Sequence, residues 1–218
     1  MSINIQFVSD YVCPFCYVNK IALGKACEGK DVKIEYVPYE LTPETQKQVD
    51  VYHDPVRKAN WQKTIAPVVK KLGLDMKLPP KVSPRPYTRL AHEGYYYALN
   101  HGKGLLYNDL VYKAYFSDES DIGDLQVLKQ LAAEISLDAE DFGNALIEGA
   151  YRSRVTDAKN SAALAQVKTL PTIRIGDTIL NGGIHSQEFF ETLLEKAQLT
   201  SGEESVTDSG CGVDSCTF

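Results

Sequence analysis

The sequence predicts an α/β fold in which a large all-helical insertion separates two pieces of one sheet. Three observations carry this prediction. A strand–helix–strand pattern opens the chain over residues 3–37. From Pro43 to about Val167, apolar residues recur at helical spacing and no convincing strand pattern appears. Strand patterns return over residues 172–180 and one more helix follows, so the order is β-α-β, a helical block, then β-β-α.

The opening unit is a strand, a helix and a second strand. Residues 3–9 alternate and then become apolar, which favours a strand. Residues 14–27 have helical spacing, and Gly29 follows as a stop signal. Val32–Val37 alternates with period two, and Pro38 ends it. A unit of this length predicts two parallel strands joined by a right-handed crossover.

The middle of the chain is expected to be helical. Asp54-Pro55 opens a stretch whose apolar residues are spaced for one buried face: Val56, Trp61, Ile65, Val68, Val69 and Leu72. Prolines at positions 79, 80, 84 and 86 then mark an irregular link. Further helices are predicted over residues 87–100, 105–116, 125–135, 139–146 and 149–166.

The second sheet piece is a hairpin. Thr172–Ile175 and Thr178–Leu180 are predicted to be paired strands around a Gly176-Asp177 turn. Ser186 is the expected N-cap of a helix that runs to about Gln198. Beyond that point the composition becomes small, polar and acidic, which indicates a mobile tail.

Joined without the helical block, the terminal segments have the thioredoxin arrangement of a central sheet flanked by helices. We therefore divide the chain into three parts. Residues 1–52 and 167–199 form a thioredoxin-like domain, residues 53–166 form an inserted helical domain, and residues 200–218 form a flexible cysteine-containing tail.

Composition limits the class of function. The chain has 218 residues, 44% hydrophobic and 24% charged, which is ordinary for a soluble globular protein. The formal net charge of −6 argues against nucleic acid or an anionic membrane as the main partner. No apolar run is long enough to span a bilayer. The N-terminus lacks the pattern of a signal peptide, so we expect a cytoplasmic protein.

Cys13-Pro14-Phe15-Cys16 is the stretch that carries chemistry. It lies between the first strand and the first helix, which is the arrangement of a dithiol/disulfide redox centre. A thiolate at a helix N-terminus faces free N–H groups and the positive end of the helix dipole. Pro14 fits at the first helical position. Half of a zinc site and a pair of buried small residues are the alternatives; the strand–turn–helix context favours redox.

Four motifs resemble one family. They are Asp10–Tyr17, Val37–Leu41, Leu170–Thr172 and Gly182–Ser186. Together they resemble the DsbA-like branch of the thioredoxin superfamily, and most closely its FrnE-type thiol–disulfide oxidoreductases. The chain departs from that pattern in having Phe15 where Trp is usual, and Thr169-Leu170-Pro171 where Gly-Val-Pro is common.

The resemblance implies a disulfide oxidoreductase or isomerase that works by mixed-disulfide exchange. Cys13 is then the nucleophile and Cys16 the resolving thiol. Pro171 is implied to be a cis-proline opposite the cysteines, and Leu170 to offer its backbone to an extended substrate. No metal or organic cofactor is implied. Glutathione or a thioredoxin-type partner is the expected recycling agent.

Other residues have auxiliary interpretations. Pro14 and Phe15 are expected to tune the redox balance, and neither brings a positive charge to the motif. Glu40 is interpreted as a solvated strand-end carboxylate, with an acid/base near Cys16 as the alternative. Cys27 is expected to be a buried small residue. Tyr95–Tyr97 is interpreted as packing, with a groove over the active site as the alternative.

A second cysteine pair, Cys211 and Cys216, lies in the tail. It is interpreted as a shuttle dithiol for Cys13–Cys16, as a metal ligand pair or as incidental. A different class of function follows if all four thiolates bind zinc in a sensor or structural module. A glutathione-dependent transferase or isomerase on the same scaffold is a further alternative, although such proteins usually carry Ser where this chain has Cys13.

Overall fold

The computed structural model describes residues 2–161 and 167–203. A four-stranded sheet with the order β2-β1-β3-β4 lies at its centre. The strands are β1 (Ile3–Ser9), β2 (Val32–Pro38), β3 (Thr172–Ile175) and β4 (Thr178–Asn181). β1 pairs in parallel with β2 and antiparallel with β3, and β3 and β4 form a hairpin. The predicted β-α-β and β-β-α units are confirmed as parts of one sheet.

One face of the sheet is apolar because side chains alternate along a strand. Ile3, Ile5 and Phe7 of β1 are buried, and their neighbours Asn4 and Gln6 are exposed and half-buried on the other face. Helix α1 (Pro14–Cys27) and helix α9 (Gln187–Glu203) pack against each other. α9 also packs against β1 and β3, and Phe190 and Leu194 of this helix are fully buried.

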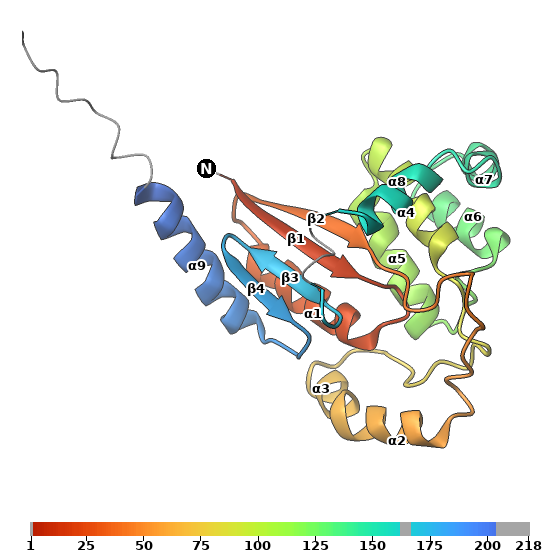
Figure 1. Cartoon of the computed structure of the whole chain (residues 1–218), viewed down its shortest axis with the longest axis horizontal. Coiled ribbons are helices and arrows are strands. Elements are labelled where there is room, and N and C mark those ends of the chain that lie inside the picture. Colours follow the sequence, from red (N-terminus) through yellow and green to blue (C-terminus); the bar gives the residue numbers. More distant parts are fainter. Residues whose placement is uncertain (1, 162–166, 204–218) are drawn as a thin grey trace, which may run out of the picture.

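The helical block contains α2 (Pro55–Thr64), α3 (Ala66–Lys71), α4 (Arg89–Asn100), α5 (Gly104–Phe116), α6 (Leu125–Glu134), α7 (Ala139–Ile147) and α8 (Arg152–Lys159). Figure 1 shows α4 to α8 gathered beyond β2, with α9 beside β4 on the opposite side. Tyr107, Tyr112, Tyr115, Phe116 and Phe142 fill the core of the block and are fully buried. These large rings account for much of the area that holds the block together.

The prediction of one helix over residues 54–72 is wrong, because the structure has two helices there. The predicted helix breaks at Ile65, between α2 and α3, and Pro67 follows within the first turn of α3. Proline lacks an N–H and clashes with the preceding turn, so it starts a helix better than it continues one. The expected buried face is also wrong at both ends, because Val56 is 78% exposed and Leu72 is 43% exposed.

Two other predicted boundaries move. The helix expected over residues 149–166 begins only at Arg152 and ends at Lys159, and Gly149 has a φ of +67° that no α-helix accepts. Residues 162–166 lie outside the described part of the chain. Helix α9 continues to Glu203, beyond the expected start of the tail. Its predicted N-cap is confirmed, since the Phe189 N–H donates to Ser186 Oγ at 3.2 Å.

Within the described ranges, the helices are all too short or too polar to cross a bilayer.

Candidate active site

Cys13 is the N-cap of α1. The chain leaves β1 at Ser9 and turns through Asp10, whose carbonyl accepts a hydrogen bond from the Cys13 N–H at 3.1 Å. Cys13 has extended backbone angles, and its own carbonyl accepts from the N–H groups of Cys16 and Tyr17. Pro14 follows in the first helical turn, as predicted. Cys13 therefore lies at the positive end of the helix.

The two motif cysteines differ in their surroundings. Cys13 is 5% exposed and Cys16 is 0% exposed, and both are free thiols. Burial raises the pKa of Cys16 well above its usual range, and a side-chain hydrogen bond with Cys13 raises it further. Cys16 is therefore protonated at neutral pH, and of the two residues only Cys13 has any exposed surface. This difference suits a nucleophile followed by a resolving thiol.

A buried carboxylate lies beside Cys16. Asp10 is fully buried, and its Oδ2 accepts from the Leu41 N–H at 2.7 Å. Its Oδ1 makes no hydrogen bond within the described chain and lies 3.6 Å from His92 Nε2. A hydrogen bond with the Asp10 backbone lowers the pKa of Cys16, and the charge of the Asp10 carboxylate raises it. Asp10, and not Glu40, is thus the buried carboxylate that interacts with Cys16.

The cations at this site come from the helical block. Arg85, in the proline-rich link, is 6% exposed and interacts electrostatically with both Asp10 and Cys13. Burial lowers the pKa of Arg85, and these two neighbours oppose that shift. Pro14 and Phe15 bring no positive charge, as expected, and the fold places the Arg85 side chain near Cys13 instead.

Aromatic rings enclose this charged cluster. Tyr11 stacks on His92 with ring centres 4.7 Å apart, and Tyr17 stacks on Tyr112 at 5.0 Å. The Tyr112 hydroxyl donates to the Asp10 carbonyl at 3.4 Å. Burial raises the pKa of Tyr112 well above its usual range, so it stays a neutral donor. Through these stacks the turn before α1 contacts α4, and α1 itself contacts α5.

Pro171 lies at the same end of the sheet. The Leu170–Pro171 peptide bond is cis, as predicted. Thr172 pairs with Val8, so Pro171 precedes β3 where β1 runs out toward the Cys13 turn. The Pro171 carbonyl accepts from the Gly182 N–H at 2.8 Å. The register therefore brings Pro171 and the cysteine motif to the same end of the sheet.

Glu40 differs from its preferred interpretation. Its side chain is 2% exposed and is paired with Lys159 Nζ of α8 at 2.6 Å. The prediction of a solvated carboxylate is therefore wrong: the pair joins the end of β2 to the helical block.

Asn19 is a functional candidate that sequence reasoning missed. It is fully buried in α1 and bonds to Phe15, Gly183 and His185. Asn19 lies four positions before Leu23, so helical spacing places both residues on one face of α1, and both are buried.

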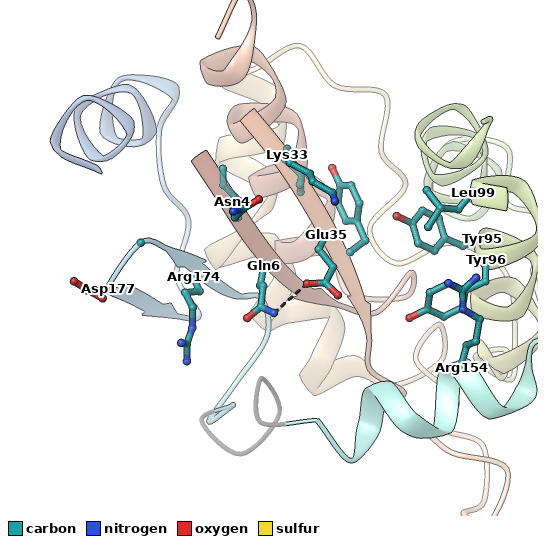
Figure 2. A pocket seen from close by; sticks show the side chains of 14 residues that line it. Asn4, Gln6, Lys33, Glu35, Tyr95, Tyr96, Leu99, Arg154, Arg174 and Asp177 are labelled. Atoms are coloured by element: carbon teal, nitrogen blue, oxygen red, sulfur yellow. Dashed lines mark hydrogen bonds between the residues drawn. The ribbon is translucent and has the colours of Figure 1, made fainter. Parts of the chain in front are cut away.

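A pocket of about 700 Å³ lies on the polar face of the sheet, away from the dithiol. Figure 2 shows Gln6 and Glu35 on its floor, joined by a hydrogen bond of 3.0 Å, with Tyr95, Tyr96 and Arg154 on the helical side. Neither motif cysteine lines this pocket. The alternative in which these tyrosines line a groove over the active site is therefore not supported.

The remaining cysteines are only partly described. Cys27 is half-buried, so the prediction of a buried residue is met in part, and burial raises the pKa of its thiol. Cys211 and Cys216 lie outside the described residues. Over residues 2–161 and 167–203, His, Cys, Asp and Glu side chains form no group that could hold a metal ion.

Comparison with known proteins gives a consistent result. Residues 4–195 match the DSBA-like thioredoxin domain family. The uncharacterized protein YwbO of Bacillus subtilis (strain 168) is 40% identical over 199 residues, which cover 91% of this chain and 98% of that protein.

Two solved structures share the fold. The probable DsbA oxidoreductase SCO1869 from Streptomyces coelicolor superposes with a TM-score of 0.77 at 24% identity, covering 99% of each chain. The cytosolic disulfide reductase DsbM from Pseudomonas aeruginosa with GSH gives a TM-score of 0.63 at 16% identity, covering 93% of this chain and 100% of that one.

Proposed function

The chain belongs to the DSBA-like thioredoxin domain family, and from this we propose that it is a thiol–disulfide oxidoreductase whose working dithiol is Cys13–Cys16. The observation that carries the proposal is the paired placement of these thiols. One caps a helix with access to solvent, and the other is buried beside a carboxylate. Pro171 lies at the same end of the sheet as the two cysteines.

The geometry supports a two-step exchange. The Cys13 thiolate attacks one sulfur of a substrate disulfide, forms a mixed disulfide and releases the other sulfur as a thiolate. Cys16 then loses its proton and attacks the Cys13 sulfur. The second substrate thiol leaves, and Cys13 and Cys16 end as a disulfide. The substrate has gained two electrons that the dithiol has lost, and the reverse sequence oxidises a substrate dithiol.

The environment of Cys16 keeps the two steps in sequence. Its raised pKa keeps it protonated while Cys13 reacts, so that premature attack is disfavoured. Asp10 is the buried ionisable group beside Cys16, and we propose that it accepts the Cys16 proton in the second step. Arg85 interacts electrostatically with both Asp10 and Cys13, and we propose that it balances the charge of Asp10.

We further propose that the protein works in the cytoplasm and is recycled by glutathione or by a thioredoxin-type protein. Similarity in fold to a cytosolic disulfide reductase whose structure contains GSH supports this proposal. The direction of exchange depends on the reduction potential of the dithiol. A potential above the cytosolic glutathione poise of about −220 to −320 mV would make it an oxidant or isomerase, and one below it a reductase.

The test is to measure that potential and to trap the intermediate. Cys16→Ser protein should accumulate a mixed disulfide with a glutathionylated peptide, and Cys13→Ser should form none. Cys27→Ser is the matched control, because it removes the other described thiol and should leave exchange intact. A Cys13→Ser protein that still exchanges disulfides at the wild-type rate would refute the assignment.

A further inference from the structure

The side chain of Asn19 makes hydrogen bonds both within its own helix and to a loop far along the chain. Asn19 lies three residues after Cys16 and has no exposed surface. Its Nδ2 donates to the carbonyls of Phe15 at 2.8 Å and Gly183 at 3.0 Å, and its Oδ1 accepts from the His185 N–H at 3.1 Å. Two acceptors and one donor surround this side chain, and only an amide satisfies all of them.

The bonds of Asn19 reach a loop that contains two successive glycines. Gly182 and Gly183 have φ angles of +70° and +81°, a region where glycine is far freer than other residues. Asn19 pairs with the backbone on both sides of Ile184, as a neighbouring strand would. A buried amide with two donors and one acceptor engaged fixes such a segment well.

The same loop is bonded to the cis-proline segment. The Gly182 N–H donates to the Pro171 carbonyl at 2.8 Å, and a Cβ on Gly182 would lie 2.5 Å from Thr169 Cγ2. Phe15, at the other end of the link, is inside the cysteine motif itself. A path of hydrogen bonds and one stretch of backbone, Gly182-Gly183, therefore runs from the Cys13–Cys16 turn through Asn19 to Pro171.

We propose that Asn19 is a positioning residue for disulfide exchange, which sets the distance between the dithiol and the Leu170–Pro171 segment and so determines how an extended peptide disulfide fits between them. The proposal rests on the proposed function of Cys13 and Cys16. Asn19 touches no reacting atom. Its effect falls on substrates long enough to contact both segments, and spares those that meet Cys13 alone.

The test compares a glutathionylated peptide with a small disulfide, hydroxyethyl disulfide. Asn19→Ala and Asn19→Asp, which keeps the shape but loses both donors, should lower kcat/KM for the peptide about tenfold, equivalent to about 1.4 kcal/mol. The loss should appear mainly in KM. Turnover of hydroxyethyl disulfide and the rate of Cys13 alkylation by iodoacetamide should be unchanged.

Asn108→Ala is the matched control. Asn108 is 2% exposed in α5, and within the described chain its Nδ2 has no hydrogen-bond partner. It should leave the ratio of peptide to small-disulfide activity at the wild-type value. Equal losses on both substrates in the Asn19 variants, or a shift of that ratio in Asn108→Ala, would overturn the proposal.

If the Asn19 variants do not fold, a measurement on the wild-type protein takes their place. The His185 amide should be protected from hydrogen exchange, because Asn19 accepts its hydrogen bond. Exchange at the rate of an open amide would refute the link. Failure of the proposed function looks different: the wild-type protein would then exchange neither disulfide, whatever the His185 amide does.

Discussion

Two helical glycines allow the packing of the helical block to be tested by one kind of substitution. Gly94 lies in α4, two positions after His92. A Cβ at Gly94 would lie 2.3 Å from Tyr107 Oη and 2.8 Å from Phe142 Cζ. Both side chains are 0% exposed, so neither can move away into solvent. Gly24 lies in α1 and is exposed, and a Cβ at this position would have no other atom within 4 Å.

The two substitutions are expected to change the free energy of unfolding in opposite directions. Replacing a helical glycine by alanine gains about 1 kcal/mol of helix propensity. Overpacking costs typically about 1–3 kcal/mol, and contacts this short put Gly94→Ala at the upper end. We therefore expect Gly24→Ala to raise the free energy of unfolding by about 1 kcal/mol, and Gly94→Ala to lower it by about 2 kcal/mol.

Thermal unfolding monitored by circular dichroism checks both values. A chain of this size shifts by about 2–4 °C per kcal/mol, so Tm should rise by about 2–4 °C in Gly24→Ala and fall by about 4–8 °C in Gly94→Ala. Disulfide exchange should also slow in Gly94→Ala, because α4 carries His92 to the active site. A Gly94→Ala protein as stable as Gly24→Ala would refute the packing of α4 against Tyr107 and Phe142.

Three further results are expected. In the reduced protein, the unfolded chain ionises Cys16 above a pH of about 8.5 whereas the folded chain keeps it protonated, so the free energy of unfolding should fall as pH rises past that value. Cys16→Ser should show a smaller fall in denaturant titrations, because only the contribution of Cys27 and the buried tyrosines remains, and an identical fall in that variant would assign it to these other groups. Asp10→Asn removes a negative charge beside Cys16 and should lower the pKa of this thiol, measured by alkylation against pH in a Cys13→Ser background; a rise would mean that Asp10 does not act through its charge. Asp138 caps α7 by accepting from the N–H groups of Glu140 and Asp141, and Asp138→Ala should cost about 1 kcal/mol in unfolding titrations, with no loss expected if the cap is absent.

What the sequence predicted correctly is local. The strands around Phe7 and Ile173 alternate clearly, and the motif from Cys13 to Cys16 has its context in adjacent residues, so both could be placed without knowing the fold. Pro67 shows the limit of periodicity, because a regular apolar pattern continued through the point where a proline ends the helix.

The missed parts of the site depend on tertiary contacts. Arg85 lies in a link without a periodic pattern, after the cis peptide bonds Leu78–Pro79 and Ser83–Pro84. Nothing near it in sequence indicates that it lies close to Asp10. Glu40 was interpreted as solvated because its partner, Lys159, lies far along the chain. Asn19 gave a weak signal, as a polar residue on an apolar helical face, but its loop partners follow only from the topology.

The ion pairs and rings around Cys16 belong to two segments of the chain. Asp10 comes from the turn after β1, whereas Arg85, His92 and Tyr112 come from the inserted helices and their links. The two segments are therefore not interchangeable modules. A chimera that keeps Cys13-Pro14-Phe15-Cys16 but takes residues 53–166 from a relative would take from that relative the groups that here are Arg85, His92 and Tyr112. Its redox behaviour would follow the donor of the helices as much as the donor of the cysteines.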